Sequence, residues 1–302
     1  MPGLEYDLGM RGFVLFLILG LSSLSSAIRN GEPLLDQARP VVVRLYSVHK
    51  DESFSLGTLR SVYVNWCSAV AISDQVLLTA GHCLFPENSD VRLQPYAVQY
   101  QSDGKPRTVK ALDFWTSYRR ESSAFPYDPE TAYHPDYVKG CRPGPVPLVN
   151  SPEPDVALVQ FPPGTFQAWW PVDLESSVQI GEAIEYFGFG FTKDSFTVTP
   201  MGPDVENGAL RRATNQVVRE SPQRIAFWNP PESSWADSGD SGGPILRKGR
   251  VVAIMATRHE KCETQFGEDY KIMNTATRVR EFWLKLPEDI RHRFQSLAPS
   301  LR

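Results

Sequence analysis

The sequence has few cysteines and little excess charge of either sign. Its 302 residues include only four cysteines, Cys67, Cys83, Cys141 and Cys262, and none belongs to a CxxC pair. A metal site or a dithiol redox motif therefore has little support. The formal net charge is −4, and the basic residues are scattered rather than clustered. This balance gives no indication of a nucleic-acid or anionic-membrane partner.

Long hydrophobic runs are also missing, apart from one near the start of the chain. An apolar run from Phe13 to Leu21 follows a basic residue and precedes small residues ending in Ala27. This is the three-part layout of a secretory signal. A helix that crosses a bilayer requires about 20 apolar residues, and this run is much shorter. The length of the run therefore favours a cleaved signal over a retained anchor. Acidic residues at the very start are unusual for a signal, so the true start is either Met1 or Met10. We expect residues 1–27 to be removed on export.

From residue 40 onward, short runs rich in Val, Ile and aromatic residues alternate with turn residues. The strand-like runs are 40–48, 61–72, 75–80, 155–161, 182–190, 215–220, 224–228 and 251–257. Many short strands with no helical pattern between them predict an all-β sandwich or barrel. The exception lies near the end, where apolar residues from Val279 to Leu286 share one face of a predicted helix that starts at Thr277. Residues 140–154 contain five prolines and predict an irregular loop.

Three short motifs carry candidate chemistry: LTAGHC at 78–83, DVAL at 155–158 and GDSGGP at 239–244. The first two have ordinary explanations. A lone His beside a Cys is more often structural, and an Asp that opens a strand is usually a turn or cap residue. GDSGGP is more specific, because glycines, an acid and a serine share one sharp turn. Such a turn exposes the serine hydroxyl and directs backbone N–H groups outward.

Together the three motifs fit one catalytic arrangement. A serine hydroxyl is a poor nucleophile until a base removes its proton, and a histidine does this near neutral pH. A buried carboxylate fixes the tautomer of that histidine, and backbone N–H groups bind the oxyanion that forms on the attacked carbonyl. Ser241 is then the predicted nucleophile, His82 the base and later acid, and Asp155 the orienting carboxylate. The N–H groups of Gly239 and Ser241 form the predicted oxyanion hole.

These motifs, in the order His, Asp, Ser, resemble the trypsin/chymotrypsin-like serine protease family. HPDY at 134–137, FGFG at 187–190 and the terminal helix are further similarities. The resemblance covers nearly all of the chain from residue 28. It implies one protease domain, residues 28–302, built of two packed six-stranded antiparallel β-barrels and a C-terminal helix. The boundary between the barrels is expected near 160–180, and the triad in the cleft between them.

The resemblance also implies how the site is braced and activated. Cys67 and Cys83 fall where the family places a disulfide beside the catalytic histidine. Family members insert a free apolar N-terminus that pairs its amine with the acid before the serine, here Asp240. Residues 28–31, Ile-Arg-Asn-Gly, are similar to the family's N-terminal sequence, so cleavage after Ala27 would expose Ile28 without a propeptide step. The alternative is cleavage elsewhere and a disordered start, because Arg29 departs from the family's small apolar residue.

The substrate pocket departs from the family's common patterns. The position that usually sets primary specificity lies six residues before the serine and is Trp235, where an Asp would have implied cleavage after Lys or Arg. In a gapless alignment, Thr257 and Arg258 line the pocket entrance and Glu268 lies on a wall. Arg258 and Glu268 either pair with each other and narrow the pocket, or one of them recognises an opposite charge on the substrate. Trypsin-like specificity by its usual route is not expected.

The two remaining cysteines lack the family's usual pairing. Cys262 aligns with a family cysteine whose partner is replaced here by Asp237. A bridge from Cys141 to Cys262 would tie the proline-rich insertion over the substrate groove, and two free thiols are the alternative.

The sequence therefore predicts a secreted or periplasmic serine endopeptidase that acts on protein or peptide substrates. No metal or organic cofactor is required by this chemistry, and we expect a monomer with no nucleic-acid partner and no membrane association after signal cleavage. One alternative is a catalytically silent protease-fold binding protein whose unusual pocket blocks the groove. Another is an esterase that uses the same triad on small molecules.

Overall fold

A computed structural model describes most of the predicted strands and the three motifs. The described residues are 28, 32–33, 41–48, 65–85, 93–100, 106–116, 154–190, 198–199, 202–203, 210–229, 236, 239–262 and 271–301. Within these ranges, no helix has the length and hydropathy that a membrane crossing requires. The predicted signal, residues 1–27, lies outside the described part of the chain.

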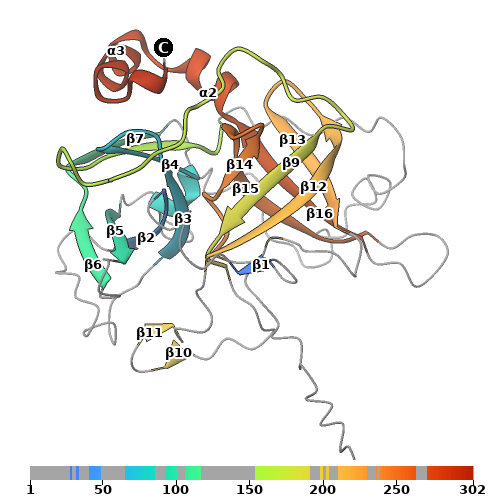
Figure 1. Ribbon diagram of the computed structural model, residues 1–302, viewed down its shortest axis with the longest axis horizontal. Coiled ribbons are helices and arrows are strands. Elements are labelled where there is room, and N and C mark those ends of the chain that lie inside the picture. Colours follow the sequence, from blue (N-terminus) through green and yellow to red (C-terminus); the bar gives the residue numbers. More distant parts are fainter. Residues whose placement is uncertain are drawn as a thin grey trace, which may run out of the picture.

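Two antiparallel β-sheets lie side by side and account for most of the fold (Figure 1). The N-terminal sheet has seven strands in the order β6-β5-β2-β3-β4-β8-β7. Its strands are β2 (Val42–Val48), β3 (Asn65–Ala71), β4 (Val76–Thr79), β5 (Gln94–Tyr100), β6 (Pro106–Lys110), β7 (Asp113–Thr116) and β8 (Ala157–Gln160). Every residue of β2 and β4 is buried, including the polar residues Arg44 and Ser47 of β2.

The second sheet closes on itself. Its order is β1-β12-β13-β16-β15-β14-β9, and an additional pairing of β9 with β12 joins six of these strands into a ring. The strands are β1 (Glu32–Pro33), β9 (Ala183–Gly188), β12 (Arg211–Glu220), β13 (Arg224–Asn229), β14 (Pro244–Arg247), β15 (Arg250–Cys262) and β16 (Lys271–Arg278). β1 adds to the edge of β12. A separate two-stranded pair is formed by β10 (Val198–Thr199) and β11 (Gly202–Pro203).

Three apolar clusters hold these sheets together. One fills the N-terminal sheet, a second fills the closed ring, and a third packs between the sheets and under the helices. The third cluster joins Val42 of β2 and Leu78 of β4 to Phe187 of β9, Ile254 of β15 and Phe282 of the first terminal helix. Full burial of each such side chain contributes about 1.5–3 kcal/mol. The relative position of the two sheets is therefore set by a continuous core.

The predicted C-terminal helix is present as α2 (Val279–Lys285), which begins at Val279 rather than Thr277, and a second helix follows it. Helix α2 ends at Leu286, which has extended backbone angles because Pro287 follows it. Helix α3 (Glu288–Leu297) begins directly afterwards, with Glu288 and Asp289 in its first turn, where acidic residues are favoured by the helix dipole. The short helix η3 (Pro299–Leu301) ends the described chain. The sequence pattern did not predict α3 or η3.

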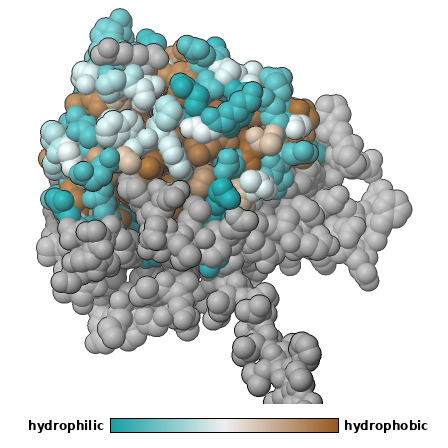
Figure 2. Space-filling model, in the orientation of Figure 1, coloured by the Kyte–Doolittle hydropathy of each residue, from teal (hydrophilic) through white to brown (hydrophobic). Residues whose placement is uncertain are grey.

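The expected architecture of two packed antiparallel β-barrels with a C-terminal helix is confirmed. The structure extends β15 from the predicted end at residue 257 to Cys262. It also adds strands that the sequence pattern did not include: β1, β5, β6, β7, β10, β11, β14 and β16. The N-terminal barrel is a curled sheet of seven strands rather than six. In the orientation of Figure 1, the described surface is a mosaic of hydrophilic and hydrophobic residues (Figure 2).

Candidate active site

The predicted base and carboxylate meet at the end of two paired strands. β4 runs into the short helix η1 (Gly81–Leu84), which carries His82, and its neighbour β8 begins just after Asp155. Nδ1 of His82 lies 2.7 Å from Oδ2 of Asp155, and the backbone N–H of His82 donates to Oδ1 at 2.8 Å. The Asp155 side chain is 10% exposed and that of His82 is 29% exposed. A neutral imidazole that donates from Nδ1 presents Nε2 as a proton acceptor.

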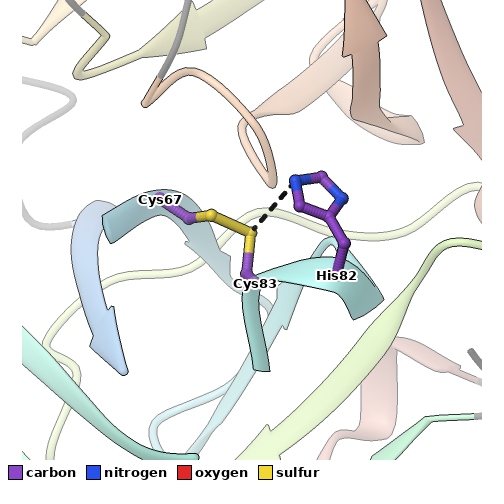
Figure 3. A group of neighbouring side chains, drawn as sticks. All are labelled: Cys67, His82 and Cys83. Atoms are coloured by element: carbon purple, nitrogen blue, oxygen red, sulfur yellow. Dashed lines mark hydrogen bonds between the residues drawn. A yellow bond between two sulfur atoms is a disulfide. The ribbon is translucent and has the colours of Figure 1, made fainter. Parts of the chain in front are cut away.

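A disulfide braces the segment that carries His82. Cys67 of β3 and Cys83 of η1 are bonded, as the family resemblance implied, and Figure 3 shows the bridge beside the imidazole ring. Cys83 Sγ lies 3.9 Å from Nε2 of His82. The two sulfurs and the imidazole come within 4.8 Å of one another, a spacing that could hold a metal ion. Sulfurs already joined in a disulfide are not thiolate ligands, so this group does not fit a metal.

The GDSGGP segment forms a sharp turn before β14. Gly239 and Gly242 have φ of +94° and +83°, values that favour glycine. The N–H of Gly242 donates to the carbonyl of Met255 in β15 at 2.8 Å, and the N–H of Gly243 donates to that of Asp240 at 2.9 Å. These bonds fix the turn against the C-terminal barrel, with Ser241 partly buried at its tip.

The turn also contacts the N-terminal barrel, which brings Ser241 to the disulfide that lies beside His82. The N–H of Ser68 donates to the carbonyl of Ser241 at 2.8 Å, and the Ser241 carbonyl lies 3.9 Å from Cys83 Sγ, the atom that also contacts His82. Within the described residues, the Ser241 hydroxyl and the imidazole do not form a hydrogen bond. In enzymes without substrate such bonds are often long and tighten in the reactive complex.

Asp240 lies in a buried cradle beneath the turn. It is 1% exposed, and its Oδ1 accepts the N–H of Gly190 at 2.7 Å. Cβ atoms added at Gly188 and Gly190 would come within 2.0 Å and 2.4 Å of its carboxylate oxygens, so side chains there would expel the carboxylate. The negative charge of the Asp240 carboxylate also affects the nearby Tyr186. Burial raises the pKa of Tyr186 and the negative charge of Asp240 raises it further.

Ile28 is buried in the same barrel. It is 0% exposed and belongs to the apolar cluster that includes Tyr186, Ala213 and Ala236. Its φ of +42° is unusual for a β-branched residue. Shortly after it, β1 pairs Glu32 with Arg212 of β12. Ile28 and β1, which follow the predicted cleavage point, are therefore both attached to the barrel that holds Asp240.

The predicted specificity residues are only partly described. Trp235, Glu268 and Cys141 lie outside the described residues. Thr257, Arg258 and Cys262 belong to the backbone of β15, and their side chains are outside the description. The predicted pocket contacts and the Cys141–Cys262 bridge accordingly stay predictions.

Two residues that sequence reasoning missed also organise the site. Ser68 accepts the N–H of Phe189 and donates to the carbonyl of Gly239, both at 2.9 Å. Asn274 of β16 is 0% exposed and exchanges two hydrogen bonds of 3.3 Å with the backbone of Ala236, next to Trp235. Neither lies in a motif, and the only sequence signal for Ser68 is its place beside Cys67 in a predicted strand.

Comparison with known proteins identifies the family. Residues 67–254 match the model of the trypsin-like peptidase domain, and the chain belongs to this family. A vitellin-degrading protease of Bombyx mori is 22% identical over 198 residues, which cover 63% of this chain and 65% of that protein. The chain therefore spans about two thirds of that relative's length. A solved structure of a scabies mite inactivated protease paralogue has a TM-score of 0.52 at 15% identity and covers 88% of this chain and 100% of its own. That likeness concerns the fold.

Proposed function

We propose that this protein is a secreted or periplasmic serine endopeptidase that hydrolyses peptide bonds through an acyl-enzyme intermediate. The observation that carries the proposal is the His82–Asp155 pair of 2.7 Å beside the glycine-flanked turn of Ser241. The alternative of a catalytically silent protease-fold binding protein has no comparable support, because the nucleophile, the base, the carboxylate and the glycines of the turn are all present.

In the proposed mechanism, Nε2 of His82 accepts the proton of the Ser241 hydroxyl as Oγ attacks the substrate carbonyl. Asp155 stabilises the imidazolium by accepting a hydrogen bond from its Nδ1–H. The oxyanion is bound by the N–H groups of Gly239 and Ser241, and each such donor is worth about 10²–10³ in rate. His82 then gives its proton to the leaving amine, and water hydrolyses the acyl enzyme by the same route in reverse.

We further propose that export completes the site. Cleavage after Ala27 would free the amine of Ile28, which is buried in the barrel that holds the Asp240 carboxylate. A cationic amine near this carboxylate would fix the turn that carries the oxyanion donors. Within this proposal, the primary specificity is not for Lys or Arg, since Trp235 stands where an acidic residue would select them.

The test combines a fluorophosphonate with intact-mass measurement of the exported protein. We expect one adduct on the wild-type chain, none on Ser241→Ala, and a mass that starts at Ile28. A wild-type protein that starts at Ile28 and takes no adduct would contradict the enzymatic function and bring forward the binding-protein alternative. An adduct on a chain with a different start would retain the hydrolase and reject activation by export. Comparison of peptide and ester substrates then separates an endopeptidase from an esterase.

A further inference from the structure

Ser68 occupies a position at which three parts of the site meet. It lies in β3 of the N-terminal barrel, is 0% exposed, and directly follows the disulfide-bonded Cys67. Its hydroxyl donates to the carbonyl of Gly239 at 2.9 Å and accepts the N–H of Phe189 at 2.9 Å. One hydroxyl therefore uses both its donor and an acceptor lone pair on backbone groups of the other barrel.

The backbone of Ser68 is also held on both sides, so both its main chain and its hydroxyl are fixed by hydrogen bonds. Its N–H donates to the Ser241 carbonyl at 2.8 Å, and its own carbonyl accepts from Thr79 Oγ1 at 2.9 Å. A Cβ at Gly242 would come within 2.1 Å of the same carbonyl, so the serine turn packs directly on this strand. The hydroxyl of Ser68 is thus a fixed group rather than a rotating surface side chain.

The two backbone groups that Ser68 joins belong to the oxyanion side of the site. Gly239 supplies a predicted oxyanion N–H, and its φ is +94°. Because glycine can adopt many other backbone angles, contacts from neighbouring residues are needed to hold its peptide groups in this conformation. Phe189 stands between Gly188 and Gly190, the two residues whose missing side chains make room for Asp240. The Phe189 ring receives a second contact from the N-terminal barrel, since the Arg44 guanidinium lies 5.2 Å from its centroid.

We propose that Ser68 is a positioning residue that joins Phe189 to Gly239 across the two barrels and thereby holds the oxyanion hole in its binding geometry. This inference rests on the function proposed above and deepens it. Without the hydroxyl, the Gly239 carbonyl loses its buried donor, and rotation of the Gly239 backbone toward another donor would turn its N–H away from the oxyanion. The loss would destabilise the transition state, which carries the oxyanion, and would change the affinity for the substrate little.

The experiment compares Ser68→Ala with Ser68→Thr and with Ser47→Ala in the exported protein. Ser47 of β2 is also 0% exposed, and among the described residues its hydroxyl has no hydrogen-bond partner, so its truncation is a matched control. The readouts are kcat and KM on a peptide substrate, the rate of fluorophosphonate labelling, and thermal unfolding.

For Ser68→Ala we expect kcat and the labelling rate to fall about tenfold or more, less than the roughly 10²–10³-fold for loss of an oxyanion donor itself. KM should stay within about twofold, because ground-state binding does not use the oxyanion contact. Ser68→Thr keeps the hydroxyl and should recover most of the rate, and Ser47→Ala should match the wild type. Wild-type kcat in a folded Ser68→Ala protein would overturn the inference.

A measurement on the wild type covers the case in which Ser68→Ala does not fold. Hydrogen exchange of the Phe189 amide should be slow in the native protein, because its N–H donates to Ser68 Oγ. Fast exchange of this amide would overturn the inference.

The two proposals fail differently. If the wild type is never labelled, the proposed enzymatic function fails while the Ser68 contact is still tested by exchange. If the wild type is labelled and Ser68→Ala is labelled equally fast, only the positioning role fails.

Discussion

Asp155 contacts His82 twice, through the ring and through the backbone. One carboxylate oxygen lies 2.7 Å from Nδ1, and the other accepts the backbone N–H of the same residue at 2.8 Å. The carboxylate therefore fixes both the imidazole and the chain that carries it. Both contacts require an acceptor, because the backbone N–H is always a donor and the predicted base needs its proton on Nδ1.

This geometry makes Asp155→Asn the sharpest test of the predicted triad. The amide can accept through one atom only, so its NH₂ faces either the backbone N–H or Nδ1 and favours the wrong imidazole tautomer. We expect kcat to fall by about 10⁴, with KM little changed, when measured by steady-state kinetics on a peptide substrate. Thermal unfolding of the same variant serves as the control for folding. A loss of less than about tenfold in a folded protein would argue that Asp155 does not orient the base.

The turn around Ser241 predicts different costs for two glycine substitutions. Gly242 has a φ of +83°, and an added Cβ would lie 2.1 Å from the Ser68 carbonyl. Gly249 has a φ of +74°, but nothing lies within 4 Å of its added Cβ. Gly249→Ala should therefore cost only the backbone strain, about 1–2 kcal/mol of unfolding free energy. Gly242→Ala should cost clearly more and abolish fluorophosphonate labelling. Equal chemical-denaturation midpoints for the two variants would contradict this packing argument.

Removal of the Ile28 side chain tests activation by export. Ile28 is fully buried in the cluster of the C-terminal barrel, so Ile28→Gly removes the apolar contacts that would hold the freed N-terminus inside. We expect slower catalysis with the His82–Asp155 pair undisturbed, and unchanged kcat/KM would reject the idea. Substitution of Ala27 that blocks cleavage should have the same effect on activity. Mass spectrometry of each protein checks where the chain begins.

The sequence points to the candidate catalytic groups more directly than to the residues that hold them in place. The motifs at His82, Asp155 and Ser241 were recognisable because each reaction role demands a particular side chain in a particular turn. Ser68 and Asn274 were not, since a serine or asparagine in a strand acquires its role only from the register that places it opposite another segment. Helix α3 was missed because its apolar face is sparse: Ile290, Phe294 and Leu297 are its only apolar residues, and only Phe294 is fully buried.

The Asp173–Arg247 pair predicts how stability changes with pH. Arg247 ends β14, the strand that follows the serine turn, and its guanidinium lies 2.9 Å from Asp173 and 3.0 Å from Glu182. Burial opposes ionisation of Asp173, but hydrogen bonds from Ser176, Arg247 and the backbone outweigh it and lower its pKa from 3.8 to about 2. The folded state therefore holds the ionised form more strongly than the unfolded chain does.

A lowered folded-state pKa contributes stability above the unfolded pKa and loses it as the pH falls through the folded one. The difference for Asp173 corresponds to about 2 kcal/mol of unfolding free energy, present at pH 7 and lost between roughly pH 4 and pH 2. Asp173→Asn should be less stable by about this amount at pH 7 and should approach the wild type near pH 2. The control is Asp113→Asn, since Asp113 pairs with Arg293 at 2.7 Å but is 50% exposed, and exposed pairs contribute about 0–1 kcal/mol. Urea unfolding from pH 2 to 7 measures both, and a pH-independent gap between Asp173→Asn and the wild type would mean that the carboxylate charge is not what stabilises this link.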